Sequence, residues 1–279
     1  MKKFIRQYPV WSFLIINYFI SWTFLYPSYR IIENAGQITP MALIGLVGAY
    51  GPTVAALIVQ YIIDKNQFKT LIKKLIKVRA TFKIIAFVII APIVFYCLAY
   101  LLSAAVYDEA LNFNLVYAIS NIPFWFLAAL PFGPMGEELG WRGFMLPKLL
   151  ENNSVYKSTI YVGLAWGIWH LASFTFPGAA IPDFFDVSIG TILLYFLNTI
   201  ALSFVFTYVY LKTKGSVFYA ILLHAFFNAA ANITSDFFDE PTKSSFLISA
   251  YIVNIILAGL CGLFLIRNYR SEKILPENR

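Results

Sequence analysis

The segment 131–147 reads PFGPMGEELGWRGFMLP and places Glu137, Glu138 and Arg142 inside an otherwise apolar stretch. The chain around it is 60% apolar and only 13% charged, whereas soluble domains contain about 25% charged residues. A charged side chain near the bilayer centre costs roughly 2.5–3.5 kcal/mol on insertion scales. Three such groups therefore need partners within the protein, and their presence indicates a functional site.

The distribution of apolar residues predicts the fold class. A membrane-spanning helix needs about 20 mostly apolar residues, and eight segments meet this requirement. We therefore expect an all-α polytopic membrane protein with about eight transmembrane helices, in which residues 1–279 form a single membrane domain. The expected spans are approximately 10–29, 39–63, 84–107, 116–135, 158–176, 188–211, 216–234 and 246–266.

The charge pattern predicts the orientation in the membrane. The net charge is +7, but 18 of the 21 Lys and Arg residues fall on the cytoplasmic side when the eight spans begin with a cytoplasmic amino terminus. This one-sided pattern argues for the lipid bilayer and against nucleic acid as a partner. We expect a multi-pass protein of the cell membrane with both termini cytoplasmic. The acidic residues expected on the outer side are Glu33, Asp108, Glu109, Asp183, Asp186, Asp236, Asp239 and Glu240.

The basic stretch 64–83 follows the second expected span. Apolar residues such as Phe68 and Leu71 alternate there with lysines such as Lys69 and Lys73. This spacing predicts an amphipathic interfacial helix on the anionic inner leaflet. The helix is either a basic cytoplasmic connection or an element that gates access of substrate.

A helix break is predicted directly before the acidic pair. Pro131, Gly133, Pro134 and Gly136 interrupt the apolar segment 116–150, which is too long for one straight span. Broken helices at membrane depth are tolerated only where protein or a water-filled cavity receives the freed backbone groups. We therefore expect the break and the two carboxylates to border the same cavity.

The two glutamates are expected to have different partners. Glu138 and Arg142 are four residues apart, so they lie on one helix face and can form an ion pair. Glu137 points about 100° away from Glu138 and stays available for another partner. The alternative is that all three charged groups only tie neighbouring helices together.

Both histidines of the chain, His170 and His224, lie in expected spans. His224 and Asn228 are four residues apart and project from the same helix face. At 1.5 Å per residue, Glu137, His170 and His224 lie roughly 15, 18 and 12 Å from the expected cytoplasmic helix ends. These depths are similar, so we expect the three side chains in one layer of the membrane. There, Glu or His can deprotonate water, and His or Asn can donate hydrogen bonds to an oxyanion. These groups are sufficient for hydrolysis of an amide by water.

Three short motifs follow one another within residues 116–234. They are Glu137-Glu138-x-x-x-Arg142, Trp166-x-x-x-His170 and His224-x-x-x-Asn228. In order and spacing they resemble the motifs of the CPBP family, the CAAX-protease and bacteriocin-processing intramembrane proteases, also called the Abi family. The resemblance implies that 116–234 is a catalytic core and that the substrate is a membrane-associated protein or peptide.

The resemblance also implies a role for each motif residue. Glu137 would activate water together with His170, while His224 and Asn228 would form the oxyanion site. The three residues that would support this arrangement are Glu138, Arg142 and Trp166. The second motif of the family usually begins with Phe, and Trp166 takes that place here, which retains an aromatic wall but alters the shape of the pocket.

Metal dependence is left open by the sequence. Family members have been described both as metalloproteases and as glutamic proteases, and the chain lacks the HExxH arrangement of zinc proteases. We expect no obligatory cofactor. If zinc is bound, the expected ligands are Glu137, His170 and His224.

Two functions of other classes compete with an intramembrane endopeptidase. A non-proteolytic membrane protein of the same family could retain the pocket for immunity or for binding a partner. A proton-coupled transporter could use the intramembrane Glu and His residues as a proton relay. The absence of a repeated pair of interrupted helices argues against the transporter.

Overall fold

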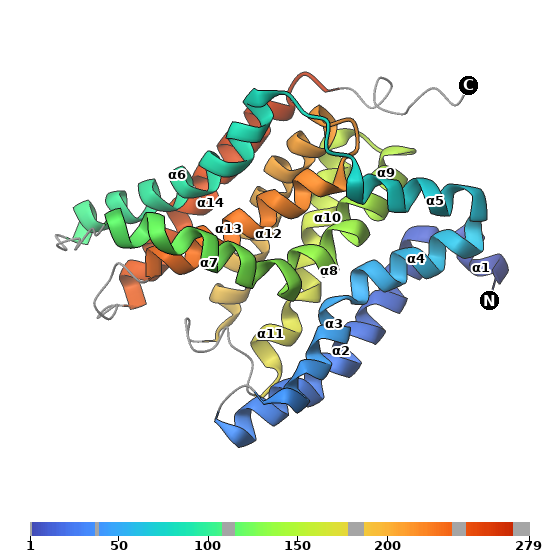
Figure 1. Cartoon of the computed structure of the whole chain (residues 1–279), viewed down its shortest axis with the longest axis horizontal. Helices are drawn as coiled ribbons and strands as arrows, with labels where there is room; N and C mark the ends of the chain where they lie inside the picture. The colour runs from blue at the N-terminus through green and yellow to red at the C-terminus, as the bar shows by residue number, and fades with distance from the viewer. Residues whose placement is uncertain (1, 37–38, 108–114, 178–186, 236–243, 270–279) are drawn as a thin grey trace.

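The computed structural model describes residues 2–36, 39–107, 115–177, 187–235 and 244–269 of the chain. Within these ranges the regular secondary structure is entirely helical, as Figure 1 shows. The prediction of an all-α polytopic membrane protein is therefore confirmed at the level of fold class.

Four described helices are long and apolar enough to cross a membrane. Apolar runs of this length bury all their backbone polar groups in internal hydrogen bonds, which is the condition for a lipid environment. The four helices are α2 (Pro9–Ala35), α6 (Phe82–Tyr107), α12 (Ile189–Lys212) and α14 (Ser244–Ile266).

The expected span 39–63 is broken in the structure. The short helices η1 (Pro40–Ile44) and α3 (Gly45–Ala49) are followed by α4 (Gly51–Ile63), with a bend of 44° between the two parts. Pro52 lies in the first turn of α4, where the missing N–H prevents the preceding helix from continuing straight. Counted as one span, this pair raises the number of candidate spans in the described residues to five.

The other three expected spans correspond to shorter helices. They are α7 (Leu115–Phe132), α10 (Val155–Trp169) and α13 (Val217–Ser235). The span expected over 158–176 is divided, because α10 ends directly before His170 and α11 (Leu171–Thr175) begins directly after it. The number of eight transmembrane helices stays a prediction.

The segment with the acidic pair is a series of short helices. Gly133 ends α7 with an abrupt change of backbone direction, so the predicted break is present. The following elements are α8 (Pro134–Glu138), the π-helical segment η3 (Leu139–Met145) and α9 (Leu146–Leu150). Stretches of π-helix are rare and occur frequently at functional sites.

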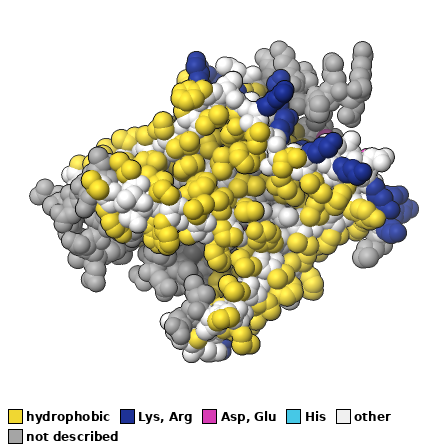
Figure 2. Space-filling view, in the orientation of Figure 1, with side chains coloured by type: hydrophobic (Ala, Val, Ile, Leu, Met, Phe, Trp, Pro, Cys, Tyr) yellow, Lys and Arg dark blue, Asp and Glu magenta, His cyan; other side chains and the backbone are white. Residues whose placement is uncertain are grey.

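The predicted amphipathic helix is present as α5 (Lys65–Lys73) with a 3₁₀ turn, η2 (Lys74–Ile76). Asp64 caps α5 by accepting a hydrogen bond of 2.8 Å from the backbone N–H of Asn66. Figure 2 shows Lys and Arg side chains along one edge of the molecule, near α5 and the amino terminus. The acidic residues expected on the other side at 108–109, 183–186 and 236–240 lie outside the described residues.

The described surface is apolar over most of the face in Figure 2. Large side chains such as Trp11, Phe19, Phe82 and Leu260 are more than half exposed. A surface of this kind is unstable in water and fits a lipid environment. Inside, α12 packs against α10 and α14, and α13 packs against α6 and α7. The acidic segment lies next to α4 and α13, within this group of helices.

Candidate active site

Two glycines allow the acidic segment to approach the bent pair α3 and α4 closely. A Cβ atom at Gly136 would lie 2.5 Å from the carbonyl oxygen of Ala49, and a Cβ atom at Gly140 would lie 2.6 Å from that of Pro52. Any larger residue would push the two backbones apart. This close contact fixes the position of α8 and η3, which carry the two carboxylates.

Glu138 is surrounded by cationic and polar partners. Arg142 Nη1 donates to both Glu138 oxygens, at 2.8 and 3.1 Å, so the ion pair expected from the spacing is present. His224 Nδ1 lies 2.8 Å from Glu138 Oε1. The side chains of Glu138 and Arg142 are completely buried. Glu138 therefore connects Arg142 on the following segment η3 with His224 on α13.

Arg142 is held by aromatic rings as well as by Glu138. Its guanidinium carbon lies 4.6 Å from the ring centre of Trp166 and 4.1 Å from that of Phe206, which are favourable cation–π distances. Arg142 Nη2 also donates to Ser203 Oγ on α12, at 3.2 Å. These contacts hold the cation in place beside Glu138.

Glu137 is held by neutral hydrogen-bond donors. The indole N–H groups of Trp141 and Trp166 both donate to Glu137 Oε2, at 3.2 and 2.6 Å. Glu137 is 3% exposed, so these bonds form in a site that excludes most solvent. Two indoles orient the carboxylate without neutralising its charge, and they leave Oε1 available.

The second oxygen of Glu137 faces a small space above Gly133. A Cβ atom at Gly133 would lie 3.2 Å from Glu137 Oε1, 3.7 Å from Asn228 Nδ2 and 3.9 Å from His224 Nε2. A carboxylate oxygen, an amide N–H₂ and an imidazole nitrogen thus converge on one point. Glycine at position 133 places no side chain among these three polar atoms.

Hydrogen bonds at Nδ1 define the available nitrogen of each histidine. His224 Nδ1 faces the Glu138 carboxylate, and His170 Nδ1 lies 3.0 Å from the carbonyl oxygen of Trp166. Both partners only accept hydrogen bonds, so each Nδ1 carries the proton. In the neutral tautomer, the lone pair of each imidazole is therefore on Nε2, free to act as a base or to bind water.

His170 lies at the junction of α10 and α11. Its ring centre lies 5.8 Å from that of Trp166 and 5.1 Å from that of Tyr195. His170 is within electrostatic range of Glu137 and His224, but no hydrogen bond joins it to either of them in the described structure. The structure thus brings Glu137, His224 and Asn228 together directly and places His170 next to them.

Two features of the site were missed or incompletely described from the sequence. Trp141 was not predicted, although its spacing of four from Glu137 repeats the spacing of Glu138 and Arg142. Trp166 was predicted only as an aromatic wall, whereas its indole N–H makes the shorter of the two bonds to Glu137. Phenylalanine, the usual residue of the motif, cannot donate this bond.

Zinc binding by Glu137, His170 and His224, considered from the sequence, stays a prediction. Among the described residues, no three His, Cys, Asp or Glu side chains are placed to hold one metal ion. No catalytic step is therefore derived through a metal.

Comparisons with known proteins locate the same region. Residues 119–230 match the family described as type II CAAX prenyl endopeptidase Rce1-like, and this range contains every candidate residue of the site. The chain is also 31% identical over 120 residues to CAAX prenyl protease 2 of Methanococcus maripaludis. That alignment covers 42% of this chain and 44% of the archaeal protein, less than half of its length.

The range matched by the family contains the three motifs, and the helical, apolar structure agrees with a membrane protein. The residues that lie around the space above Gly133 fall inside the matched region. The region 119–230 of this chain is therefore similar to the type II CAAX prenyl endopeptidase Rce1-like family.

Proposed function

We propose that this protein is an intramembrane endopeptidase that hydrolyses peptide bonds of membrane-associated proteins or peptides with water activated by Glu137. The observation that carries this proposal is the convergence of Glu137 Oε1, Asn228 Nδ2 and His224 Nε2 on the point above Gly133. A base and two groups that can bind an oxyanion within 4 Å of one point match the requirements of amide hydrolysis.

In the first step, a water molecule binds between Glu137 Oε1 and the Nε2 atom of His170. Glu137 removes one proton from this water while the water oxygen forms a bond to the substrate carbonyl carbon. His170 accepts a hydrogen bond from the second water proton and orients the lone pair of the oxygen. The two indole N–H groups keep Oε2 fixed, so the carboxylate does not need to reorient during the reaction.

The tetrahedral intermediate carries its negative charge on the former carbonyl oxygen. Asn228 Nδ2 donates one hydrogen bond to this oxygen, and His224 donates a second from Nε2 in its imidazolium form. Glu138 stabilises that imidazolium through Nδ1. The carbon–nitrogen bond then breaks, and Glu137 gives its proton to the departing amine, so that one carboxyl and one amino terminus are formed.

The substrate is defined at present only by its chemical class. An active site between membrane helices requires a substrate that enters from the bilayer or from its surface. The relative from M. maripaludis is a CAAX prenyl protease, and the matched region contains all the proposed catalytic residues. We place the protein in the cell membrane with both termini in the cytoplasm, and substrate access on the cytoplasmic side, from the distribution of Lys and Arg.

The proposal is tested with the purified full-length protein in lipid nanodiscs and a library of fluorogenic peptides. We expect the wild-type protein to cleave a subset of the peptides. Glu137→Gln and His170→Ala should fold normally and fail to cleave, and Glu33→Gln, at the exposed ion pair with Arg30, serves as the matched control. Cleavage by both site variants at the wild-type rate would overturn the proposal. A parallel series with a strong chelator decides whether a metal takes part.

A further inference from the structure

Two asparagines are buried between the apolar helices α12 and α14, apart from the site described above. Asn198 is 7% exposed and Asn254 is 1% exposed. Asn198 Oδ1 and both amide atoms of Asn254 have no hydrogen-bond partner in the part of the chain that the structure describes. Burying amide groups without partners is costly, and native proteins usually resolve such cases with internal water.

Asn254 faces the inside of the protein. Ala250, Asn254 and Ala258 are spaced by four residues and are all buried, so they form one helix face. One residue beyond this face, a Cβ atom at Gly259 would lie 3.7 Å from Ala201 Cβ on α12. The amide of Asn254 is therefore enclosed by protein and is not directed to lipid.

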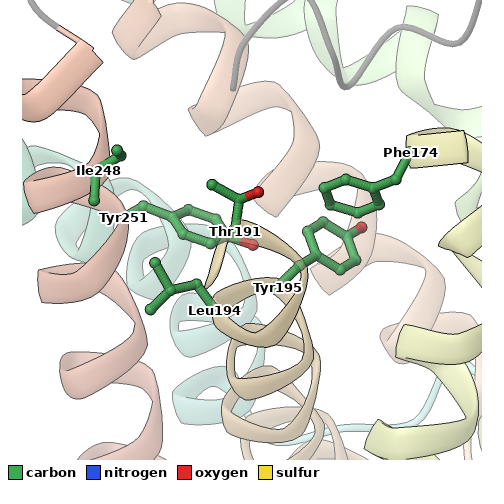
Figure 3. A pocket seen from close by; sticks show the side chains of 6 residues that line it. All are labelled: Phe174, Thr191, Leu194, Tyr195, Ile248 and Tyr251. Carbon is green, nitrogen blue, oxygen red and sulfur yellow. The ribbon is translucent and has the colours of Figure 1, made fainter. Parts of the chain in front are cut away.

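A small, partly open pocket lies between α11, α12 and α14, and Tyr251 is one of its lining residues. Figure 3 shows that the hydroxyl-bearing rings of Tyr195 and Tyr251 and the side chain of Thr191 line it together with apolar groups. Tyr251 is within hydrogen-bonding range of Asn198. Tyr251 thus lies at the pocket and near Asn198, and Asn254 follows it by three residues on α14.

The other tyrosine connects the pocket with the candidate active site. The ring centre of Tyr195 lies 5.1 Å from that of His170 and 5.0 Å from that of Phe174. Tyr195 is also within electrostatic range of Glu137. A polar route therefore leads from Asn254 and Asn198 through Tyr251 and Tyr195 to His170, across helices that are otherwise apolar.

We propose that Asn198, Asn254, Tyr251 and Tyr195 bind a file of internal water molecules that supplies the hydrolytic water to His170. The supply of hydrolytic water rests on the proposed function. The presence of the water molecules does not depend on it. The route offers neutral donors and acceptors and no charged side chain, which suits water better than an ion. Each internal water needs two to four polar partners, and amide and hydroxyl groups provide them.

The presence of water is tested by hydroxyl-radical footprinting of the full chain in lipid nanodiscs, which modifies side chains in contact with water. We expect Tyr195 and Tyr251 to be labelled faster than Tyr18. Tyr18 is also partly buried in a membrane helix, but its hydroxyl donates to Ala165 O and its ring stacks on Trp22. Labelling of Tyr195 and Tyr251 at or below the rate of Tyr18 would overturn the water file, whether or not the protein cleaves peptides.

The supply of water to the reaction is tested by Asn254→Leu. Losing one hydrogen-bonding side chain should lower the turnover number roughly fivefold and leave KM unchanged, because the occupancy of the water file falls. Asn254→Ser retains a polar group and should keep near wild-type turnover, while Ser249→Ala removes the polar contact with Ser103 elsewhere on α14 and serves as control. Unchanged turnover in a folded Asn254→Leu protein would overturn the supply route even if labelling is observed.

Discussion

Glu137 and Glu138 are neighbours in the sequence and are equally buried, yet they lie in opposite environments. Glu138 receives a guanidinium and an imidazole, which bind it from two helices. Glu137 receives two indole N–H groups on one oxygen, and its other oxygen faces the space above Gly133. The difference shows how a buried carboxylate can be held in place either by neutralising its charge or by neutral donors that preserve the charge for chemistry.

The strongest test of this comparison exchanges each carboxylate for its neutral amide. Glu137→Gln should reduce peptide cleavage roughly 10²–10⁴-fold, the usual contribution of a general base, with little change in the melting temperature. Its amide oxygen can still accept the bonds from Trp141 and Trp166. Glu138→Gln should mainly lower the melting temperature. Equal losses of activity and stability in the two variants would remove the distinction between the carboxylates.

Removing the Arg142 cation tests the environment of Glu138, the carboxylate whose charge is neutralised. Arg142→Met leaves Glu138 buried without its main partner and should lower the free energy of unfolding by about 3–5 kcal/mol. The double variant Glu138→Gln with Arg142→Met should regain part of this stability, since no uncompensated charge is left. Denaturation in a mild detergent measures all three proteins. If the double variant is as unstable as Arg142→Met alone, the ion pair is not the source of the loss.

Filling the open side of Glu137 should reduce activity without removing a charge. Gly133→Ala places a methyl group 3.2 Å from Glu137 Oε1, next to the three polar groups that are proposed to bind the reacting atoms. We expect a loss of turnover of roughly 100-fold, because small displacements at a reacting centre are costly. Gly190→Ala is the control, since its new Cβ atom would meet only Ser188 Oγ, at 3.6 Å. Activity of Gly133→Ala equal to that of the control would show that the reaction occurs elsewhere.

Removing one neutral donor should have a smaller effect. Trp166→Phe keeps the aromatic ring but loses the N–H bond of 2.6 Å to Glu137, and turnover should fall roughly tenfold. Trp22→Phe removes a comparable indole bond, of 3.1 Å to the carbonyl of Trp169, outside the site. A kinetic comparison of the two variants separates an effect on Glu137 from the general loss of a tryptophan hydrogen bond. The same decrease in both would contradict a specific role for Trp166.

The smallest expected effect concerns the far end of η3. Lys74 Nζ donates to Gly143 O at 2.7 Å and to the Tyr210 hydroxyl at 3.3 Å. Burial, with the nearby charges of Lys77 and Lys148, lowers the pKa of Lys74 from 10.5 to about 8. Between these two pH values the unfolded chain binds more protons than the folded one, so the stability of the folded protein should rise with pH there.

The corresponding measurement compares melting temperatures of wild-type protein and Lys74→Met from pH 8 to pH 10.5. The melting temperature of the wild-type protein relative to that of Lys74→Met should increase as the pH rises, because the cost of burying the ammonium disappears. Lys73→Met, at an exposed neighbouring lysine, should follow wild type. If the melting temperatures of wild type and Lys74→Met change in parallel with pH, the pKa of Lys74 is not lowered.

Local patterns made a large part of the fold and the site predictable. Apolar runs identified the helices, Gly133 and Pro134 marked the break, and the spacing of Glu138 and Arg142 identified their pair. Each of these features depends on residues within a few positions of one another. The bend between α3 and α4 was not predicted, although Pro52 marks it, and the junction at His170 was not predicted because apolar composition continues across it.

The contacts that define the chemistry connect distant positions. Trp166 reaches Glu137 across 29 positions, and His224 reaches Glu138 across 86. No periodicity of the sequence relates such residues. Which nitrogen of each histidine is available, and which oxygen of Glu137 is open, follows only from how α10, α13 and η3 pack together.

By itself, then, the sequence determined a membrane-embedded helical protein, a helix break, and an acidic pair at the depth of two histidines, because hydrophobicity and helical spacing are local properties of the chain. Only the tertiary structure decided that two indoles hold Glu137 without neutralising it and that Gly133 leaves a space in front of it. The same packing left the amides of Asn198 and Asn254 enclosed between α12 and α14. These features depend on the shape of the space between helices, which packing alone creates.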